Sequence, residues 1–309
     1  MREEFLSGLA LLTKLKRFFI RRMPLSFLGG FIVILFLLYL YHGAAVMQSW
    51  WRKPLSVSGI IWQPNNATTN IDGNWQKLGV DQLLIQWSIV DGINYLSPDT
   101  PQRPDWWRIG QQPWAKKIIL GLDGEFDERK ARTNVLILAQ KSAQIIEQKL
   151  PLNIIGYYFP VEVDPTWAEA ASIMPQALAQ LPRPLWISVY DSANVGAKIL
   201  ADWLASWLPP GVGVFFQDGV GVEARTPLVA RQYMDELAKT LGHDRVKVIV
   251  EAFRPGNAHQ FRPATKQELL PQITIMQGYD IFLFDGPNYL SNQFVTDLVS
   301  SMQKRLQAE

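Results

Sequence analysis

Eight short β-rich segments constrain the fold of this 309-residue chain more than any other feature. They are mostly apolar rather than alternating, which is typical of strands buried on both faces in a parallel sheet. The segments cover residues 57–62, 82–87, 117–122, 154–159, 185–190, 212–216, 247–250 and 281–284. Helical patterns follow at residues 128–149, 165–181, 195–208, 227–241, 266–276 and 291–306.

This alternation predicts an α/β fold, and eight repeats without a long insertion favour a (β/α)8 TIM barrel. Residues 56–309 have about the length that one such barrel needs, roughly 250 residues. A doubly wound open sheet is the alternative, but it normally carries a glycine-rich phosphate-binding turn after an early strand. The turn after the first segment is Gln63-Pro64-Asn65-Asn66, which has no glycine.

An uncharged apolar run at residues 25–41 predicts a transmembrane helix, which we assign to residues 24–42. Residues 1–23 hold six basic and two acidic side chains. The positive-inside rule then keeps this tail in the cytoplasm. We expect a single-pass protein of a bacterial inner membrane, with residues 43–55 as a stalk and the barrel in the periplasm or outside the cell. A cleaved signal peptide is the alternative, because Gly43, Ala44 and Ala45 offer small residues near a cleavage point.

Composition excludes several classes of function. The chain has no Cys, so it has no disulfides, no thiol catalysis and no Cys-based metal site. It has three His and no zinc-binding spacing, and we therefore expect neither a metal nor a cofactor. Without residues 1–23 the chain keeps 24 basic and 26 acidic side chains, a net charge of −2. This balance does not favour nucleic-acid binding.

A parallel barrel places its active site at the carboxyl ends of its strands, and seven of the eight segments are followed by a carboxylate there. We expect Glu162 and Glu251 to be catalytic. The residues expected to bind substrate are Trp62, Gln63, Trp87, Asp123, Tyr158, Tyr190, Asp191, Gln217, Asp218, Arg254 and Asp285. The alternative for each aspartate is a helix-capping or turn residue. Asp164, just before Pro165, is expected to be such an N-cap.

The two glutamates are the strongest catalytic candidates. Glu251 directly continues an apolar segment, and Glu162 is expected two residues beyond the end of its strand. A carboxylate that points into a barrel mouth must be paired or functional. Two such groups can divide the acid and the nucleophile or base roles of glycoside hydrolysis. Aromatic residues at the strand ends, such as Trp62 and Tyr190, suit the apolar faces of sugar rings.

Three motifs carry a resemblance to known proteins. They are Gly59-Ile60-Ile61-Trp62-Gln63-Pro64, Gly156-Tyr157-Tyr158-Phe159-Pro160-Val161-Glu162-Val163-Asp164 and Phe216-Gln217-Asp218-Gly219-Val220-Gly221. Over about residues 56–290 the chain resembles an uncharacterised bacterial family of glycosidase-like TIM barrels, a domain of unknown function. That resemblance implies an exported barrel tied to polysaccharide handling.

A wider similarity is to the clan of retaining glycoside hydrolases with catalytic glutamates on strands four and seven. It implies Glu162 as the acid/base and Glu251 as the nucleophile. The clan usually has Asn before the acid/base glutamate, whereas Val161 precedes Glu162 here.

Together these features predict a membrane-anchored glycoside hydrolase-like protein acting on a bacterial exopolysaccharide or cell-wall glycan. Its expected partners are a poly- or oligosaccharide, the membrane through residues 24–42, and envelope polysaccharide machinery. The alternative is a non-catalytic glycan-binding or assembly subunit. A third possibility is a structural partner in an envelope complex, which an exposed apolar patch would indicate.

Overall fold

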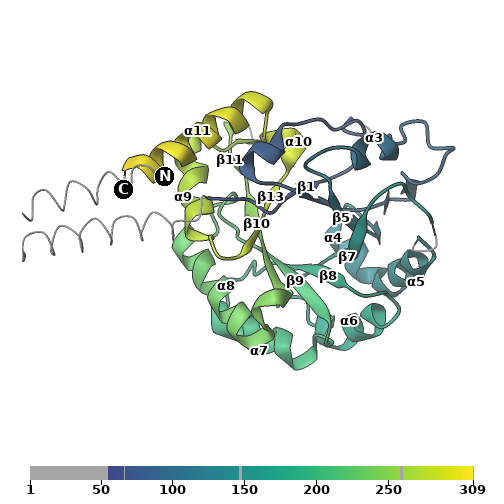
Figure 1. The fold of residues 1–309 in the computed structure, drawn as a ribbon. Helices are drawn as coiled ribbons and strands as arrows, with labels where there is room; N and C mark the ends of the chain where they lie inside the picture. Colours follow the sequence, from purple (N-terminus) through teal and green to yellow (C-terminus); the bar gives the residue numbers. More distant parts are fainter. Residues whose placement is uncertain (1–54, 66, 146–147, 258–259, 309) are drawn as a thin grey trace, which may run out of the picture. The chain divides into compact units, whose positions relative to one another are not determined.

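Eight parallel strands close into a barrel in the computed structural model of this chain (Figure 1). The structure describes residues 55–65, 67–145, 148–257 and 260–308. The predicted basic tail, membrane span and nearly all of the stalk therefore lie outside the described residues. Among the described residues, no helix has the length and apolar character needed to cross a membrane. The barrel strands are β1 (Gly59–Trp62), β2 (Gln82–Ile85), β5 (Lys117–Gly121), β7 (Ile154–Val163), β8 (Leu185–Val189), β9 (Val212–Gln217), β10 (Val246–Glu251) and β13 (Asp280–Phe284).

The strand order confirms the predicted closed barrel. Neighbours around it run β1-β13-β10-β9-β8-β7-β5-β2. Read in the opposite direction from β1, this is the order of the strands along the chain. The ring closes at β1, where Gly59 pairs with Phe282 of β13 on one side and with Gln82 of β2 on the other. An open doubly wound sheet has two edge strands, so this pairing excludes it.

Helices surround the barrel (Figure 1). They are α4 (Glu128–Thr133), α5 (Val135–Ile145), α6 (Ala170–Leu178), α7 (Ala197–Trp207), α8 (Pro227–Leu241), α9 (Lys266–Ile275) and α11 (Asn292–Ala308). Sequence signals explain their ends: α8 begins after the capping hydroxyl of Thr226 and α9 begins with a reciprocal capping box between Thr265 and Glu268. The predicted helix at residues 128–149 is divided into α4 and α5 at Asn134.

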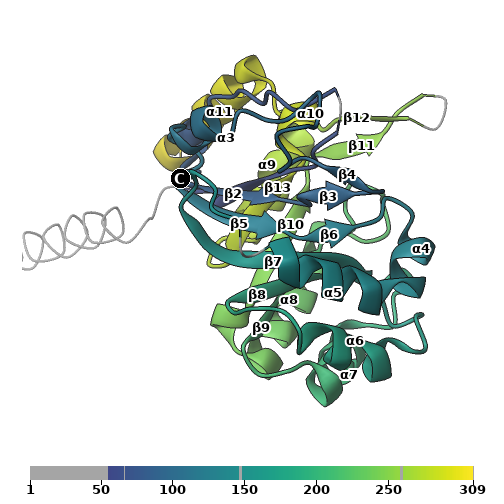
Figure 2. The same cartoon turned by 90° about the vertical axis from the view of Figure 1, so that its right-hand side faces the viewer.

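The first two strand-to-helix connections differ from the regular pattern. After β1 comes only the short 3-10 helix η1 (Trp75–Leu78), and after β2 only α3 (Trp106–Gly110). Three short strands, β3 (Ile89–Val90), β4 (Ile93–Asn94) and β6 (Asp123–Gly124), form a separate small sheet. Other additions are the hairpin β11 (Phe253–Pro255) with β12 (Phe261–Pro263) and the single turn α10 (Gly286–Tyr289). In Figure 2 the small sheet, the hairpin and α4 lie at the same end of the barrel.

Asp164 is not the N-cap of α6, which corrects the sequence-based expectation. The helix begins at Ala170 and Glu169 precedes it. The Asp164 carboxylate instead accepts hydrogen bonds from the backbone N–H groups of Thr166 and Ser192, at 2.8 Å each. It thus joins the turns that follow β7 and β8.

Aromatic rings fill the barrel interior. The Phe215 ring lies edge-on to Phe282, Tyr158 and Trp186, with ring centroids 4.9, 5.9 and 6.4 Å away. The interior cluster also contains Ile61, Leu84, Ile119 and Ile249. Gly59 is required beside it, because a Cβ there would lie 2.2 Å from the Phe282 ring. This filled layer closes the barrel and forms the floor on which the site is built.

Truncating Phe215 to Ala is expected to lower the free energy of unfolding by about 3–5 kcal/mol, because it leaves a cavity in the centre of the barrel. Chemical denaturation of the full-length protein, followed by tryptophan fluorescence, measures this loss. The matched control is Phe126→Ala, whose ring is 69% exposed and which should lose less than about 1 kcal/mol. Equal losses for the two variants would contradict a packed barrel interior.

Candidate functional site

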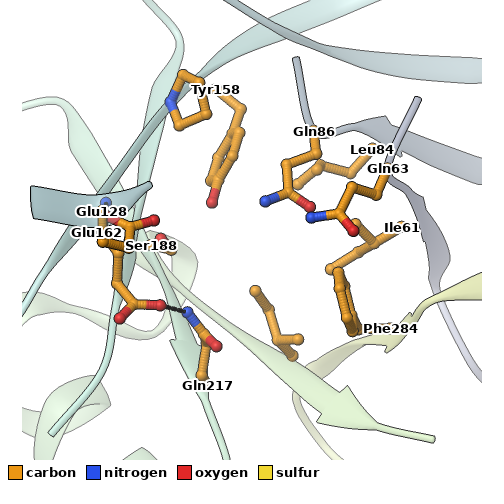
Figure 3. A pocket seen from close by; sticks show the side chains of 12 residues that line it. Ile61, Gln63, Leu84, Gln86, Glu128, Tyr158, Glu162, Ser188, Gln217 and Phe284 are labelled. Atoms are coloured by element: carbon orange, nitrogen blue, oxygen red, sulfur yellow. Dashed lines mark hydrogen bonds between the residues drawn. The ribbon is translucent and has the colours of Figure 1, made fainter. Parts of the chain in front are cut away.

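A cavity of about 210 Å³ opens at the carboxyl end of the barrel (Figure 3). Its apolar lining comes from the interior layer and from the strand ends above it: Ile61, Leu84, Pro160, Ile249 and Phe284. Its polar lining consists of Gln63, Gln86, Glu128, Tyr158, Glu162, Ser188 and Gln217. The volume is below the roughly 300–1,000 Å³ typical of sites for drug-sized ligands, so the cavity suits a single small unit.

Glu162 lines this cavity from β7 itself. The strand continues to Val163, so Glu162 is part of it and not two residues beyond its end, which corrects the sequence-based placement. The pairing of β7 with β8 shifts between Phe159 and Val163, which marks an irregularity beside Glu162. Its carboxylate accepts a hydrogen bond from the Gln217 amide of β9 and lies 3.9 Å from the Arg132 guanidinium.

Glu128 is the second carboxylate of the cavity, and it was not among the residues predicted from the sequence. It is the first residue of α4, where Asp127 caps the helix by accepting hydrogen bonds from Arg129 and Lys130. The Glu128 Oε2 atom accepts a hydrogen bond of 3.2 Å from the backbone N–H of Glu162. In the sequence, Glu128 follows the third predicted strand, which could have marked it as a site residue. A glutamate in the first turn of a helix, however, is commonly there because its charge interacts favourably with the helix dipole.

Burial raises the affinity of both carboxyl groups for a proton. Burial, and then the charge of Glu162, raise the pKa of Glu128 to about 7. Burial also raises the pKa of Glu162, although the Gln217 hydrogen bond and the Arg132 charge oppose this shift. Two acids in one poorly solvated site favour a state with one proton between them. Such a pair can supply an acid and a base at neutral pH.

The remaining polar groups of the cavity are uncharged. In Figure 3 the amides of Gln63 and Gln86 point across the cavity from one side, while Glu162 and Gln217 lie on the other. The buried Oε1 atom of Gln86 has no hydrogen-bond partner among the residues that the structure describes. Amides and hydroxyls of this kind can donate to and accept from a polyol.

Glu251 does not line the cavity, although its neighbour Ile249 does. Its Oε2 atom accepts hydrogen bonds from the backbone N–H groups of Gly221 (2.7 Å) and Val222 (3.3 Å), in the loop after β9. Gly221 is required there, because a Cβ would lie 2.6 Å from the Glu251 Cβ. Burial, and then the charge of Asp218, raise the pKa of Glu251 to about 8. The predicted nucleophile is thus covered by a loop.

Four of the thirteen predicted site residues line the cavity: Gln63, Tyr158, Glu162 and Gln217. Four other predicted residues form hydrogen bonds outside the cavity. Asp191 accepts from the Tyr233 hydroxyl (2.7 Å) and Asp285 from the backbone N–H of Asn288 (3.2 Å). Asp218 accepts from the Gln272 amide (2.5 Å), and the same Gln272 accepts from Arg254 (2.8 Å).

The remaining four predicted residues differ in exposure. Trp62 is fully buried and Trp87 is 4% exposed, so their rings belong to the core. Asp123 is also buried, and its backbone N–H donates to the Ser142 hydroxyl at 3.1 Å. Tyr190 is half-buried, and the Arg225 guanidinium lies 5.3 Å from its ring. Within the part of the chain that the structure describes, no three His, Asp or Glu side chains are grouped as metal ligands.

Comparisons with known proteins agree with the barrel fold. No protein-family model matches the chain. It is similar to an uncharacterised Escherichia coli protein, YbcH, at 25% identity over 244 residues, which covers 69% of this chain and 82% of that protein. A solved structure from Bacteroides thetaiotaomicron, described as a "putative alpha-L-fucosidase", aligns with a TM-score of 0.51 at 14% identity. The alignment covers 83% of this chain and 96% of that one, and it shows a shared barrel fold alone.

Replacing Glu251 with Gln is expected to weaken the pH dependence of stability. Folded Glu251 keeps its proton up to a pKa of about 8, whereas its ordinary value is 4.5. Between these values the unfolded chain binds fewer protons, so the free energy of unfolding falls as the pH rises. Denaturation between pH 5 and pH 8.5 should show a smaller fall for Glu251→Gln than for the wild type.

The control for this prediction is Glu236→Gln on the outer helix α8, where the carboxylate pairs with Lys239 at 3.2 Å. An exposed pair of this kind contributes little to stability, and the wild-type pH dependence should persist. Identical pH dependence in Glu251→Gln and the wild type would show that Glu251 is ionised in the folded protein.

Proposed function

We propose that this protein is a glycoside hydrolase that acts on the end of a glycan held in the barrel-mouth cavity. The observation that carries the proposal is the pair Glu128 and Glu162, which lines a cavity whose other polar groups are neutral amides and hydroxyls. A neutral lining with two carboxyl groups suits an uncharged polyol that must be protonated at one oxygen and attacked at one carbon. The shared fold with a glycosidase-like barrel is in agreement but does not identify the reaction.

In this proposal Glu128 is the acid and Glu162 is the nucleophile or base. Glu128, with a pKa of about 7, holds a proton at neutral pH and donates it to the leaving glycosidic oxygen. Glu162 is the group whose negative charge has hydrogen-bond and cationic support, from Gln217 and Arg132. It acts on the anomeric carbon, either directly or through a water molecule. This assignment replaces Glu251 by Glu128 as the partner of Glu162.

The place of action is also a proposal. The basic residues 1–23, the apolar residues 24–42 and the stalk 43–55 support a single-pass anchor in a bacterial inner membrane with the barrel outside the cytoplasm. The substrate would then be an exopolysaccharide or a cell-wall glycan, and envelope polysaccharide machinery would be the neighbouring partner.

A second candidate function is glycan binding without hydrolysis. The observation that favours it is the covered Glu251, since the clan that the chain resembles uses a strand-seven glutamate as nucleophile. Glu251 here is 4% exposed and bonded to a loop. Wild-type protein that binds glycans but never releases a reducing end would establish this alternative.

Glu162→Gln and Glu128→Gln are each expected to lower the rate of glycoside hydrolysis by about 10²- to 10⁴-fold, because each removes one acid–base group. The full-length protein is assayed with 4-nitrophenyl glycosides of glucose, galactose, mannose, N-acetylglucosamine and L-fucose, and by reducing-end release from bacterial exopolysaccharides. Glu236→Gln is the matched control and should keep wild-type rates. Wild-type hydrolysis by both cavity variants would overturn the proposal.

The rate of hydrolysis should fall as the pH rises above about 7. Glu128 loses its proton in that range, and an ionised acid cannot protonate the leaving group. Rates measured from pH 5 to pH 9 on the most active of these glycosides test this limb. A rate that stays constant from pH 6 to pH 9 would exclude Glu128 as the acid.

A further inference from the structure

Phe126 is an exposed aromatic residue on a loop that is held in place from several sides. Its ring is 69% exposed, in the short connection between β6 and α4. Single exposed apolar residues are common on protein surfaces and need no function. The surroundings of Phe126 are what set it apart.

The loop that carries Phe126 is fixed at both ends. On its amino side, β6 pairs with β3, with Asp123 opposite Ile89 and Gly124 opposite Val90. The Phe126 backbone N–H donates to the Asp91 carboxylate at 3.3 Å. On its carboxyl side α4 begins at once. This arrangement gives the loop little freedom to fold its aromatic ring inward.

Charged neighbours add to this framework. Lys130 Nζ lies 2.6 Å from Glu125 Oε2 and 3.9 Å from Asp91 Oδ1, so it joins the loop to the turn that follows β3. Glu125 is 13% exposed at its side chain, whereas Asp91 is 46% exposed. Asp91 and Lys130 thus present partly exposed polar atoms close to the exposed ring.

The ring also has a defined orientation. It lies edge-on to Trp87, with the ring centroids 6.2 Å apart and an interplanar angle of 67°. Trp87 is itself buried and held by a hydrogen bond of 2.8 Å from its Nε1 to the Pro64 carbonyl oxygen. A buried aromatic support therefore leaves the Phe126 ring directed outward.

Both rings belong to residues that adjoin cavity-lining residues in the chain. Trp87 directly follows Gln86, and Phe126 precedes Glu128 by two residues; both Gln86 and Glu128 line the cavity. The pair thus joins the connection that follows β2 to the loop that precedes α4. A glycan that leaves the cavity on this side meets the flat apolar face of Phe126, which is flanked by polar groups. Such a surface suits the apolar face of a pyranose ring.

We propose that Phe126 forms a second sugar-binding subsite, which stacks against the unit next to the one held in the cavity. This inference rests on the proposed function and extends it: the substrate is an oligo- or polysaccharide rather than a monosaccharide glycoside. Trp87 supports the subsite from below, and Asp91 and Lys130 bind hydroxyl groups at its edge.

Calorimetric binding to the full-length Glu162→Gln protein tests the subsite without turnover. The probes are methyl glycosides and linear tetrasaccharides of β-1,4-linked glucose, β-1,4-linked N-acetylglucosamine and α-1,6-linked mannose. Adding Phe126→Ala should weaken binding of the recognised tetrasaccharide about 3- to 10-fold and leave binding of its methyl glycoside unchanged. Phe126→Trp should restore the affinity, because it keeps an aromatic face.

The matched control is Trp107→Ala, an exposed aromatic residue (66%) on α3, which lies away from α4 in Figure 2. It should leave both affinities unchanged. Equal loss of methyl glycoside and tetrasaccharide binding in Phe126→Ala, or no loss at all, overturns the second subsite while the proposed function stands. Absence of binding to every sugar, together with absence of hydrolysis, overturns the proposed function itself.

Discussion

Closure of the parallel barrel is the constraint on which the rest of this structure depends. Because β1 pairs with both β2 and β13, the interior is sealed at its sides and must be filled by side chains. The Phe215, Phe282 and Tyr158 rings fill it. They also give the mouth above them an apolar floor, so that any carboxyl group placed there loses much of its hydration.

Two sets of acids lose hydration at the mouth: Glu128 with Glu162, and Asp218 with Glu251. The two sets differ in their access to the cavity. Burial raises the pKa values of Glu128 and Glu162, which still line the cavity. Asp218 begins the loop after β9, and backbone N–H groups of that loop donate to the Glu251 carboxyl group. Both sets have raised pKa values, yet only the first lines the cavity. A raised pKa by itself therefore does not distinguish the two sets, whereas access to the cavity does.

The small sheet and the loop before α4 are additions to the regular barrel that lie close together in the chain. The small sheet β3–β4–β6 precedes the loop before α4; that loop carries the exposed Phe126, and Glu128 at the start of α4 lines the cavity. The first two strand-to-helix connections carry the short helices η1 and α3 in place of long ones. The second connection also contributes β3 and β4 to the small sheet. A regular barrel thus carries its specific features on the segment between β2 and α4, as expected for a fold that hosts many functions.

The sequence by itself determined the fold class, the eight strands and most helices, because strand burial and helix capping are local patterns in the chain. It also placed Gln63, Tyr158, Glu162 and Gln217 at strand ends that meet in one cavity. It did not reveal Glu128, whose position in a first helical turn has an ordinary local explanation. Only the tertiary structure decided that Glu128 approaches Glu162 and that Glu251 is covered. Both outcomes depend on loop paths and burial, which contacts between distant segments determine.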